Sequence, residues 1–327
     1  MSNKENIVKA PLVFEPYLKS VIWGGNKICA FKGIKQKEPN IGESWEISAV
    51  PGHESVVAEG IYKGQNLTKL IDRFGADLLG TKVVERYGLF FPLLVKFIDA
   101  CDDLSVQVHP DDELARQRHN SLGKTEMWYI ISTEPGAKIY AGLKDKLSPQ
   151  TYTERVKNGT FADALAVHES NSGDIFFLPA GRVHAIGAGN LLAEIQESSD
   201  ITYRIYDYDR RDKNGNPREL HTDLAKDAID YRVYDDYRSI PVRESETVTS
   251  LVKCSHFSTQ LVNLDNEEMH LRGDGTTFHV VIVLKGEIEI STSEGNITLA
   301  EGYSALIPAA VDNMRFSGTG NFLLAKV

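Results

Sequence analysis

Two short stretches of the sequence carry side chains that can bind a metal ion. In the first, Leu104–Asp111 (LSVQVHPD), a β-strand places Gln107 and His109 on one face, because side chains two residues apart in a strand point the same way. The second, Gly173–His184, reads as a strand, a Pro-x-Gly turn and a histidine at the start of the next strand. Imidazole nitrogens and amide oxygens are ligands of borderline divalent cations. The two stretches therefore hold side chains from which a metal site can be built.

The spacing of the second stretch resembles the second metal motif of the cupin family, whose members are small jelly-roll barrels. The pattern is glycine, five residues, proline, one residue, glycine, two residues and histidine, although position 188 is alanine where the family has asparagine. The first cupin motif has His-x-His and a downstream glutamate, which correspond here to Gln-x-His and Glu126. This mixed nitrogen and oxygen set suits Zn²⁺ with an open coordination position. The resemblance implies one Zn²⁺ per chain, bound by Gln107, His109, Glu126 and His184.

A longer series of motifs is similar to the type I phosphomannose isomerase family, in its compact bacterial form. The series covers roughly residues 11–210 and comprises Trp23-Gly-Gly, Gly42-Glu-Ser-Trp45, Gln-x-His-Pro-Asp, Lys-x-Glu, Glu194 and Ser199-Asp200 leading to Arg204. The resemblance implies a zinc-dependent aldose–ketose isomerase. Its substrates would be mannose 6-phosphate and fructose 6-phosphate, interconverted through an enediol intermediate.

The same resemblance implies roles for further residues around the metal. Arg204 matches the arginine of the family's Ser-Asp-x3-Arg stretch, and its planar positive charge suits an enediolate or phosphate oxygen. Asp200 lies four residues earlier and would face the cleft with Arg204 on a strand; a structural ion pair between them is the alternative. Glu194 is the candidate general acid or base, with a supporting contact to His184 as the alternative. The candidate substrate-binding residues are Ser105, Lys124 and Arg210.

Composition limits the classes of partner. The chain has 327 residues, 42% of them hydrophobic and 25% charged, which is ordinary for a globular protein. Its net charge of −10 argues against a general nucleic-acid or membrane surface but allows a local basic site for an anionic sugar phosphate. The N-terminus lacks the apolar core of a signal peptide, and no apolar run reaches the ~20 residues that span a bilayer. Three scattered cysteines fit a reducing compartment, so we expect a cytoplasmic protein; the oligomeric state stays open.

The predicted elements are mostly strands with helical insertions. Apolar spacing predicts a helix over 66–79 with a weak point at Gly75, and an apolar run predicts a buried strand over 90–98. A helix is expected to begin near Asp111, and a strand is expected over 123–131. Ser148 followed by Pro149 predicts the start of a helix that ends near Lys157. A short helix over 161–167, strands and turns over 173–206 and a helix over 222–231 complete the N-terminal part.

The last part of the chain repeats the cupin pattern in a degenerate form. The segment from Gly302 to Asn313 keeps the glycine, five residues, proline spacing, but Ala310 replaces the second glycine and Asn313 stands where the histidine should be. We therefore expect two jelly-roll barrels, a metal-binding unit over 1–238 and a unit without metal over 239–327. The alternative is a second metal site using His256, His270 or His279.

Three classes of function fit these observations. The first is the zinc-dependent isomerase. The second is an oxidative cupin enzyme that uses iron, which the Gln-for-His replacement and the Lys-x-Glu element disfavour. The third is a non-catalytic or regulatory cupin that binds a sugar phosphate, for which an intact open metal site would not be needed.

Overall fold

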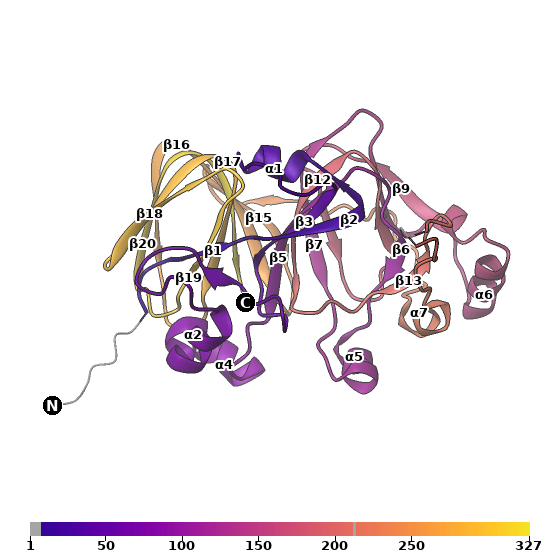
Figure 1. Ribbon diagram of the computed structural model, residues 1–327, viewed down its shortest axis with the longest axis horizontal. Coiled ribbons are helices and arrows are strands. Elements are labelled where there is room, and N and C mark those ends of the chain that lie inside the picture. The colour runs from indigo at the N-terminus through magenta and orange to yellow at the C-terminus, as the bar shows by residue number, and fades with distance from the viewer. Residues whose placement is uncertain (1–7, 212–213) are drawn as a thin grey trace.

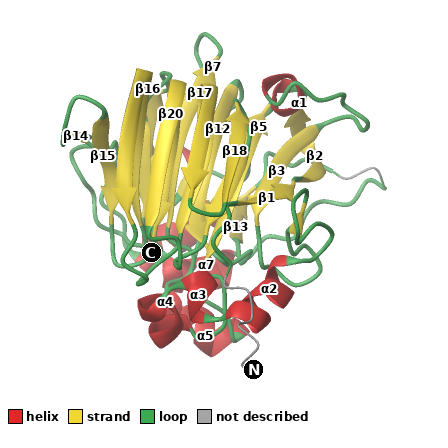
Figure 2. Ribbon diagram, turned by 90° about the vertical axis from the view of Figure 1, so that its left-hand side faces the viewer, coloured by secondary structure: helices red, strands yellow, loops and turns green. Residues whose placement is uncertain are grey.

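The computed structural model describes residues 8–211 and 214–327 and shows a mainly β protein (Figure 1). Its strands form three antiparallel sheets of nine, six and five strands. The predicted fold class, mainly β with jelly-roll units of the cupin type, is confirmed. Most helices gather at one end of the strands, where α2 to α5 and α7 lie together (Figure 2).

The six-stranded sheet lies in the middle of the molecule. Its strands, in spatial order, are β10 (Ile175–Leu178), β7 (Glu126–Thr133), β12 (Asn190–Glu197), β5 (Leu93–Ala100), β3 (Ile41–Ile47) and β2 (Tyr17–Gly25). Strand β5 is buried along its whole length because both of its faces are covered, which explains its near-continuous apolar sequence. Val95 and Phe97 pack into the core shared with the C-terminal sheet, whereas Ile98 packs toward the five-stranded sheet. Lys96 lies on the same face as Ile98 and is also buried.

The five-stranded sheet covers that second face. Its order is β13 (Tyr203–Tyr206), β6 (Val106–Val108), β11 (His184–Ile186), β8 (Lys138–Leu143) and β9 (Leu165–Glu169). An apolar cluster between the two sheets includes Trp128, Ile139 and Leu192. Val106 and Val108 point the other way, into a separate core beneath the helical insertion. The alternation predicted for this strand is therefore confirmed, with Gln107 facing the inside of the sandwich.

The C-terminal unit is a curled nine-stranded sheet. It contains β14 (Val242–Arg243), β15 (Val248–Lys253), β16 (Ser258–Arg272), β17 (His279–Thr292), β18 (Gly295–Ala300), β19 (Ser304–Ile307) and β20 (Asn313–Lys326). The two remaining strands, β1 (Leu12–Glu15) and β4 (Val56–Val57), come from the other end of the chain, and β1 pairs with β19. The division at residues 238 and 239 stays a prediction, and the pairing shows that the N-terminal segment crosses it.

The helices largely follow the predicted start signals. The helices are α1 (Lys27–Phe31), α2 (Leu67–Phe74), α3 (Ala76–Leu79), α4 (Thr81–Tyr87), α5 (Asp112–His119), α6 (Pro149–Lys157) and α7 (Thr222–Ala228). The hydroxyl of Ser148 accepts the amide of Thr151 at 3.1 Å, which confirms the predicted cap. The expected helix over 66–79 is divided at Gly75, whose φ of 50° lies in the left-handed region.

The prediction of a helix over 161–167 is wrong beyond its first turn. Only Ala162–Ala164 form a 3₁₀ turn, and the chain then continues as β9. Leu165 to Glu169 pair with β8, so sheet pairing overrides the local helical preference there. The expected helix over 222–231 is shorter than predicted and ends at Ala228.

Candidate active site

Strand pairing brings the two predicted metal stretches together. Gln107 in β6 lies directly opposite His184 in β11, and the side-chain Nε2 atoms of the two residues are 3.2 Å apart. The amide of Gly181, in the Pro-x-Gly turn, donates to the carbonyl of His109 at 2.9 Å, which ties the turn to the end of β6. The φ of Gly181 is 91°, a conformation that glycine adopts without strain. The turn therefore delivers His184 to the face that carries Gln107.

Glu126 reaches these residues from the opposite sheet. It is the first residue of β7, and its Oε1 lies 3.2 Å from Nε2 of His184 while its Oε2 lies 3.5 Å from Nε2 of His109. Rotating the Gln107 amide by half a turn presents its oxygen in place of its nitrogen. One amide oxygen, two imidazole nitrogens and one carboxylate thus converge on a common point between the sheets.

Hydrogen bonds leave both imidazoles ready to bind a cation. Nδ1 of His109 lies 2.9 Å from the carbonyl of Ile201, and Nδ1 of His184 lies 2.9 Å from the carbonyl of Arg182. Because a carbonyl accepts only from a protonated nitrogen, each Nδ1 carries the proton and each Nε2 presents an unprotonated lone pair to the space between the sheets. Burial, together with the charge of Lys124, lowers the pKa of His184 to about 3 and that of His109 well below its ordinary value. Neutral imidazoles are the form that metal ions bind.

The carboxylate supplies the test of whether a metal ion fits. Within the described part of the chain, Oε1 of the fully buried Glu126 has no hydrogen-bond partner. Burial raises the pKa of Glu126 to about 7, against the effect of Lys124. An orphaned buried carboxylate oxygen facing an imidazole lone pair is costly unless a cation joins them. These residues therefore fit a divalent cation.

Lys124 lies next to the candidate ligands. Its ammonium group donates to Oε2 of Glu126 at 2.6 Å and lies 3.1 Å from Nε2 of His109. The side chain is buried, and Lys124 also lines the adjacent cleft. The position fits a cation that acts beside the metal and toward a bound anion.

The cleft beside the ligands has a volume of about 420 Å³, the size range of small-molecule sites. Its wall carries a buried pair, in which Nζ of Lys96 donates to Oε1 of Glu194 at 3.1 Å. Nε1 of Trp128 donates to the other oxygen of Glu194 at 2.8 Å. Burial would raise the pKa of Glu194, but Lys96 and Lys124 outweigh it and lower the pKa to about 2. Glu194 is thus held ionised.

The alternative role considered for Glu194, a supporting contact to His184, is not what the structure shows. The supporting hydrogen bond of His184 is the one to the carbonyl of Arg182, while both oxygens of Glu194 are engaged by Lys96 and Trp128. Its place on the cleft wall keeps Glu194 a candidate for proton transfer.

Arg204 and Asp200 both line the cleft, as expected, but they are not partners. Nε of Arg204 lies 3.3 Å from Oγ of Ser105, and one of its Nη atoms donates to the carbonyl of Glu219 at 2.9 Å. Among the residues that the structure describes, no ion pair joins Asp200 to Arg204. Asp200 precedes β13 and is exposed, so the strand geometry assumed for the pair does not extend to it.

Arg210 is positioned differently from the other substrate-binding candidates. It donates to Oδ1 of Asp207 at 2.6 Å and to the carbonyl of Asp103, and it is not among the residues that line the cleft. Arg218 lines the cleft instead and shares Asp207 with Arg210 through a 2.7 Å hydrogen bond. The role predicted for Arg210 remains a prediction.

Sequence reasoning missed Lys96 and Arg218. Lys96 could have been found as a lone cation within an apolar strand, since a fully buried lysine needs a carboxylate partner. No local signal marks Arg218, because a polar loop separates it from the motifs.

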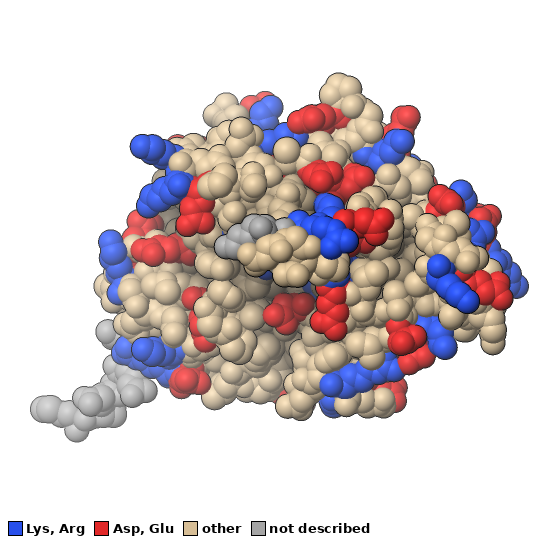
Figure 3. Space-filling model, turned by 45° about the vertical axis from the view of Figure 1, so that its right-hand side comes forward, with Lys and Arg blue, Asp and Glu red and all other residues tan. Residues whose placement is uncertain are grey.

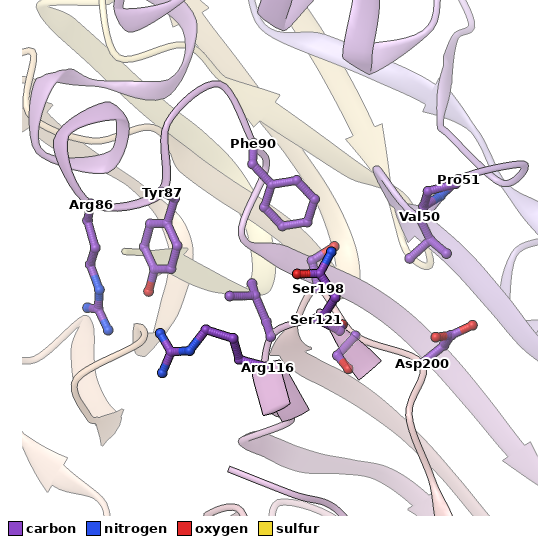
Figure 4. A pocket seen from close by; sticks show the side chains of 12 residues that line it. Val50, Pro51, Arg86, Tyr87, Phe90, Arg116, Ser121, Ser198 and Asp200 are labelled. Atoms are coloured by element: carbon purple, nitrogen blue, oxygen red, sulfur yellow. The ribbon is translucent and has the colours of Figure 1, made fainter. Parts of the chain in front are cut away.

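A second cavity, of about 510 Å³, lies next to the cleft (Figure 4). Arg86 and Tyr87 of α4 and Arg116 of α5 line one side of it, and Ser198 lies in the middle of the view. Asp200 lines both this cavity and the cleft, so it forms part of the wall between them.

Two family models match the chain. The model described as phosphomannose isomerase type I, catalytic domain, matches residues 12–129, and the model described as mannose-6-phosphate isomerase, cupin domain, matches residues 247–327. Mannose-6-phosphate isomerase ManA of Bacillus subtilis (strain 168) is 35% identical over 97% of this chain and 99% of its own length. The chain belongs to the type I phosphomannose isomerase family. The predicted family is therefore confirmed.

Other members of the family agree with this placement. Mannose-6-phosphate isomerase of Streptococcus mutans is 33% identical over 94% of this chain and 95% of its own length. The crystal structure of mannose 6-phosphate isomerase from B. subtilis superposes with a TM-score of 0.88, at 31% identity, covering 98% of this chain and 100% of that one. This chain is therefore a member of an isomerase family, as expected.

The surface adds two general observations. On the face shown in Figure 3, acidic and basic side chains are interspersed rather than separated into regions of one sign. No helix among the described residues is both long and apolar enough to cross a membrane.

Proposed function

We propose that this protein interconverts mannose 6-phosphate and fructose 6-phosphate at the cleft, with one Zn²⁺ bound by Gln107, His109, Glu126 and His184. The observation that carries the proposal is the convergence of these side chains, with both imidazole Nε2 atoms unprotonated, beside a cleft that is lined by cations and a buried carboxylate. The names of the relatives support the same substrates for this chain.

The reaction needs no external oxidant. A proton leaves C2 of the aldose while the C1 carbonyl oxygen takes a proton, which gives the enediol. The enediol then takes a proton at C1 while the O2 hydroxyl loses its proton and becomes the carbonyl oxygen. When bound, Zn²⁺ would supply Lewis-acid charge for the sugar oxygens at its open position. The rest of the chemistry requires a base near the carbons and positive charge near the oxygens.

The residues of the cleft can fill these roles. Glu194 is the candidate to exchange the carbon-bound proton, because its carboxylate lies on the cleft wall and is held ionised by Lys96. Arg204 is the candidate to stabilise negative charge on the sugar oxygens, with Ser105 fixing its guanidinium. Asp200 is proposed to act at the same wall, where it is exposed to the cleft. Residues that hold a proton acceptor and a fixed cation on one cavity wall are what an enediol pathway needs.

Phosphate binding is proposed for Ser105, Lys124 and Arg210. Ser105 and Lys124 line the cleft directly. Arg210 would act through Asp207, to which both Arg210 and the cleft-lining Arg218 donate. Arg210 and Asp207 would together orient the guanidinium of Arg218 toward the substrate. Fixed guanidinium groups suit phosphate oxygens because they donate two parallel hydrogen bonds.

We also propose a cytoplasmic location. Cys29, Cys101 and Cys254 are all free thiols in the structure. Free thiols are typical of reducing compartments.

The deciding experiment is a coupled assay of mannose 6-phosphate turnover before chelation, after chelation and after Zn²⁺ is restored, combined with elemental analysis. We expect one metal ion per chain, loss of turnover on chelation and recovery with Zn²⁺. His184→Ala should lose most of the metal and the turnover, because removing one ligand leaves Glu126 without its partner.

Three results would contradict the proposal. Full metal content in His184→Ala would rule out the ligand assignment. Sugar phosphate binding without any turnover in the metal-loaded protein would favour the non-catalytic cupin, and a redox-active iron content would favour the oxidative class.

A further inference from the structure

A turn of the C-terminal unit reaches the metal-binding unit. The turn joins β15 to β16 and is closed by a hydrogen bond from the amide of Cys254 to the carbonyl of Phe257, at 3.0 Å. Within it, Nδ1 of His256 lies 2.8 Å from Oε1 of Glu197, the last residue of β12. The Glu197 side chain is 3% exposed and that of His256 is 17% exposed, so the ion pair is largely shielded from water.

Glu197 in turn holds both backbone groups of Thr125, the residue that precedes β7. Its second carboxylate oxygen accepts the amide of Thr125 at 2.8 Å. Its own backbone amide donates to the carbonyl of Thr125 at 3.0 Å. Glu197 therefore fixes both the N–H and the C=O group of Thr125. The hydrogen bond from the Thr125 amide forms only while the Glu197 carboxylate points toward Thr125.

Thr125 lies between two residues of the candidate active site. Lys124 precedes it and contacts both His109 and Glu126, and Glu126 follows it as a candidate ligand. Because Thr125 is joined to both residues through planar peptide bonds, a shift of its backbone would move both neighbours at once. The position of this one peptide thus decides where a ligand and a cleft cation lie.

Charged residues from three elements surround His256. Glu197 of β12 and Asp112 of α5 are carboxylates close to the imidazole, while Arg86 of α4 donates to the carbonyl of Ser255 in the same turn. Oδ1 of Asp112 accepts the amide of Gly123 at 2.9 Å, so a second carboxylate also holds the lead into β7. The contact with the Glu197 carboxylate raises the pKa of His256 against its burial and the charge of Arg86. The two carboxylates therefore favour the protonated form of the imidazole.

We propose that His256 is a positioning residue for the metal centre: through Glu197 it fixes the peptide of Thr125, and so it sets Glu126 and Lys124 in place from the C-terminal unit. The role in turnover rests on the proposed isomerase function. The C-terminal unit then contributes to the reaction without providing a ligand or touching the substrate. The same three residues, Asp112, Glu197 and His256, also form a group that could bind a cation, and the experiment separates the two readings.

The test compares His256→Ala with His256→Gln in the full-length protein. His256→Ala removes the imidazole that pairs with Oε1 of Glu197, whereas the glutamine keeps an amide donor without the charge. His270→Ala is the matched control, because His270 lies in the same C-terminal sheet and its exposed side chain forms, among the described residues, an ion pair with Glu268 alone. The readouts are metal affinity, the rate of metal release to a chelator, hydrogen exchange of the Thr125 amide, and kcat and KM separately.

We expect His256→Ala to weaken metal affinity by about 10-fold, the low end of the range for residues that support metal ligands. Exchange of the Thr125 amide should become faster in the metal-free protein too. The loss in turnover should appear mainly in kcat, since Glu126 and Lys124 are displaced at the metal. His256→Gln should recover part of each effect, and His270→Ala should match the wild type.

Unchanged metal affinity and unchanged Thr125 exchange in a folded His256→Ala would overturn the proposal. A second metal equivalent in the wild type, lost in His256→Ala, would overturn it in favour of a metal site at Asp112, Glu197 and His256. If His256→Ala does not fold, Glu197→Gln supplies the test. This variant keeps an acceptor for the Thr125 amide but removes the negative charge of Glu197 that pairs with His256. A wild type without isomerase activity would contradict the proposed function alone, as metal release and amide exchange need no turnover.

Discussion

Arg204 shows what one residue of the cleft contributes. Its guanidinium is oriented by Ser105 and by the carbonyl of Glu219, so it presents a fixed positive charge to the cleft. If it stabilises charge that grows in the transition state, Arg204→Ala should lower kcat by about a hundredfold to a thousandfold, or roughly 3–4 kcal/mol, with KM little changed. Steady-state kinetics on mannose 6-phosphate measures both constants. Metal content should not change, because Arg204 is not a candidate ligand.

The matched variant Arg204→Lys keeps the charge but loses the planar fork, so it should recover only part of the rate. A rise in KM with kcat intact would mean that Arg204 only grips the phosphate of the ground state. A drop in melting temperature shared by Arg204→Ala and Asp200→Asn would revive the structural pair that the geometry argues against.

A single turn between strands, Cys254–Phe257, makes stability depend on pH. The pKa of His256 in the folded protein is raised above its ordinary value, by the bond to Glu197, despite burial and the nearby Arg86; Asp112 adds to the rise. A raised folded pKa contributes stability that is fully present below the unfolded value of about 6.5 and is lost as pH rises through the folded value. The difference in melting temperature between wild type and His256→Gln should therefore be largest at low pH within the folded range and shrink as pH rises. Melting curves across that range check it, and a difference that grows with pH would contradict it.

At the scale of the whole molecule, the N-terminal segment joins the two units. Strand β1 pairs with β19 on one side and with β4 on the other, and Phe14 of β1 is buried in the core that the two units share. A fragment of residues 239–327 would expose the edge of β19 and part of that core. We expect this fragment to show no cooperative melting, whereas the full chain melts in one transition. Calorimetry on both tests the expectation; a cooperative fragment would instead establish the predicted division at residue 238 as a folding boundary.

The sequence alone determined the features that are encoded within single elements. Gln107 and His109 share a face because of the two-residue period of one strand, and Val106 and Val108 face the opposite core for the same reason. The Pro-x-Gly turn before His184 follows from the conformations open to those residue types, and Ser148 caps α6 through a contact three residues away. Each of these depends on neighbours along the chain, so local patterns suffice.

Only the tertiary structure decided which elements meet. Lys96 lies directly opposite Glu194 because β5 and β12 pair in one register, and no pattern within either strand reveals that register. His256 reaches Glu197 across 59 positions of sequence because the C-terminal sheet packs against the end of β12. The strand β9 replaced an expected helix because its pairing with β8 stabilises it more than local preference favours the helix. Burial and cross-strand pairing are properties of the packed whole, so the charges they bring together cannot be read from the order of residues.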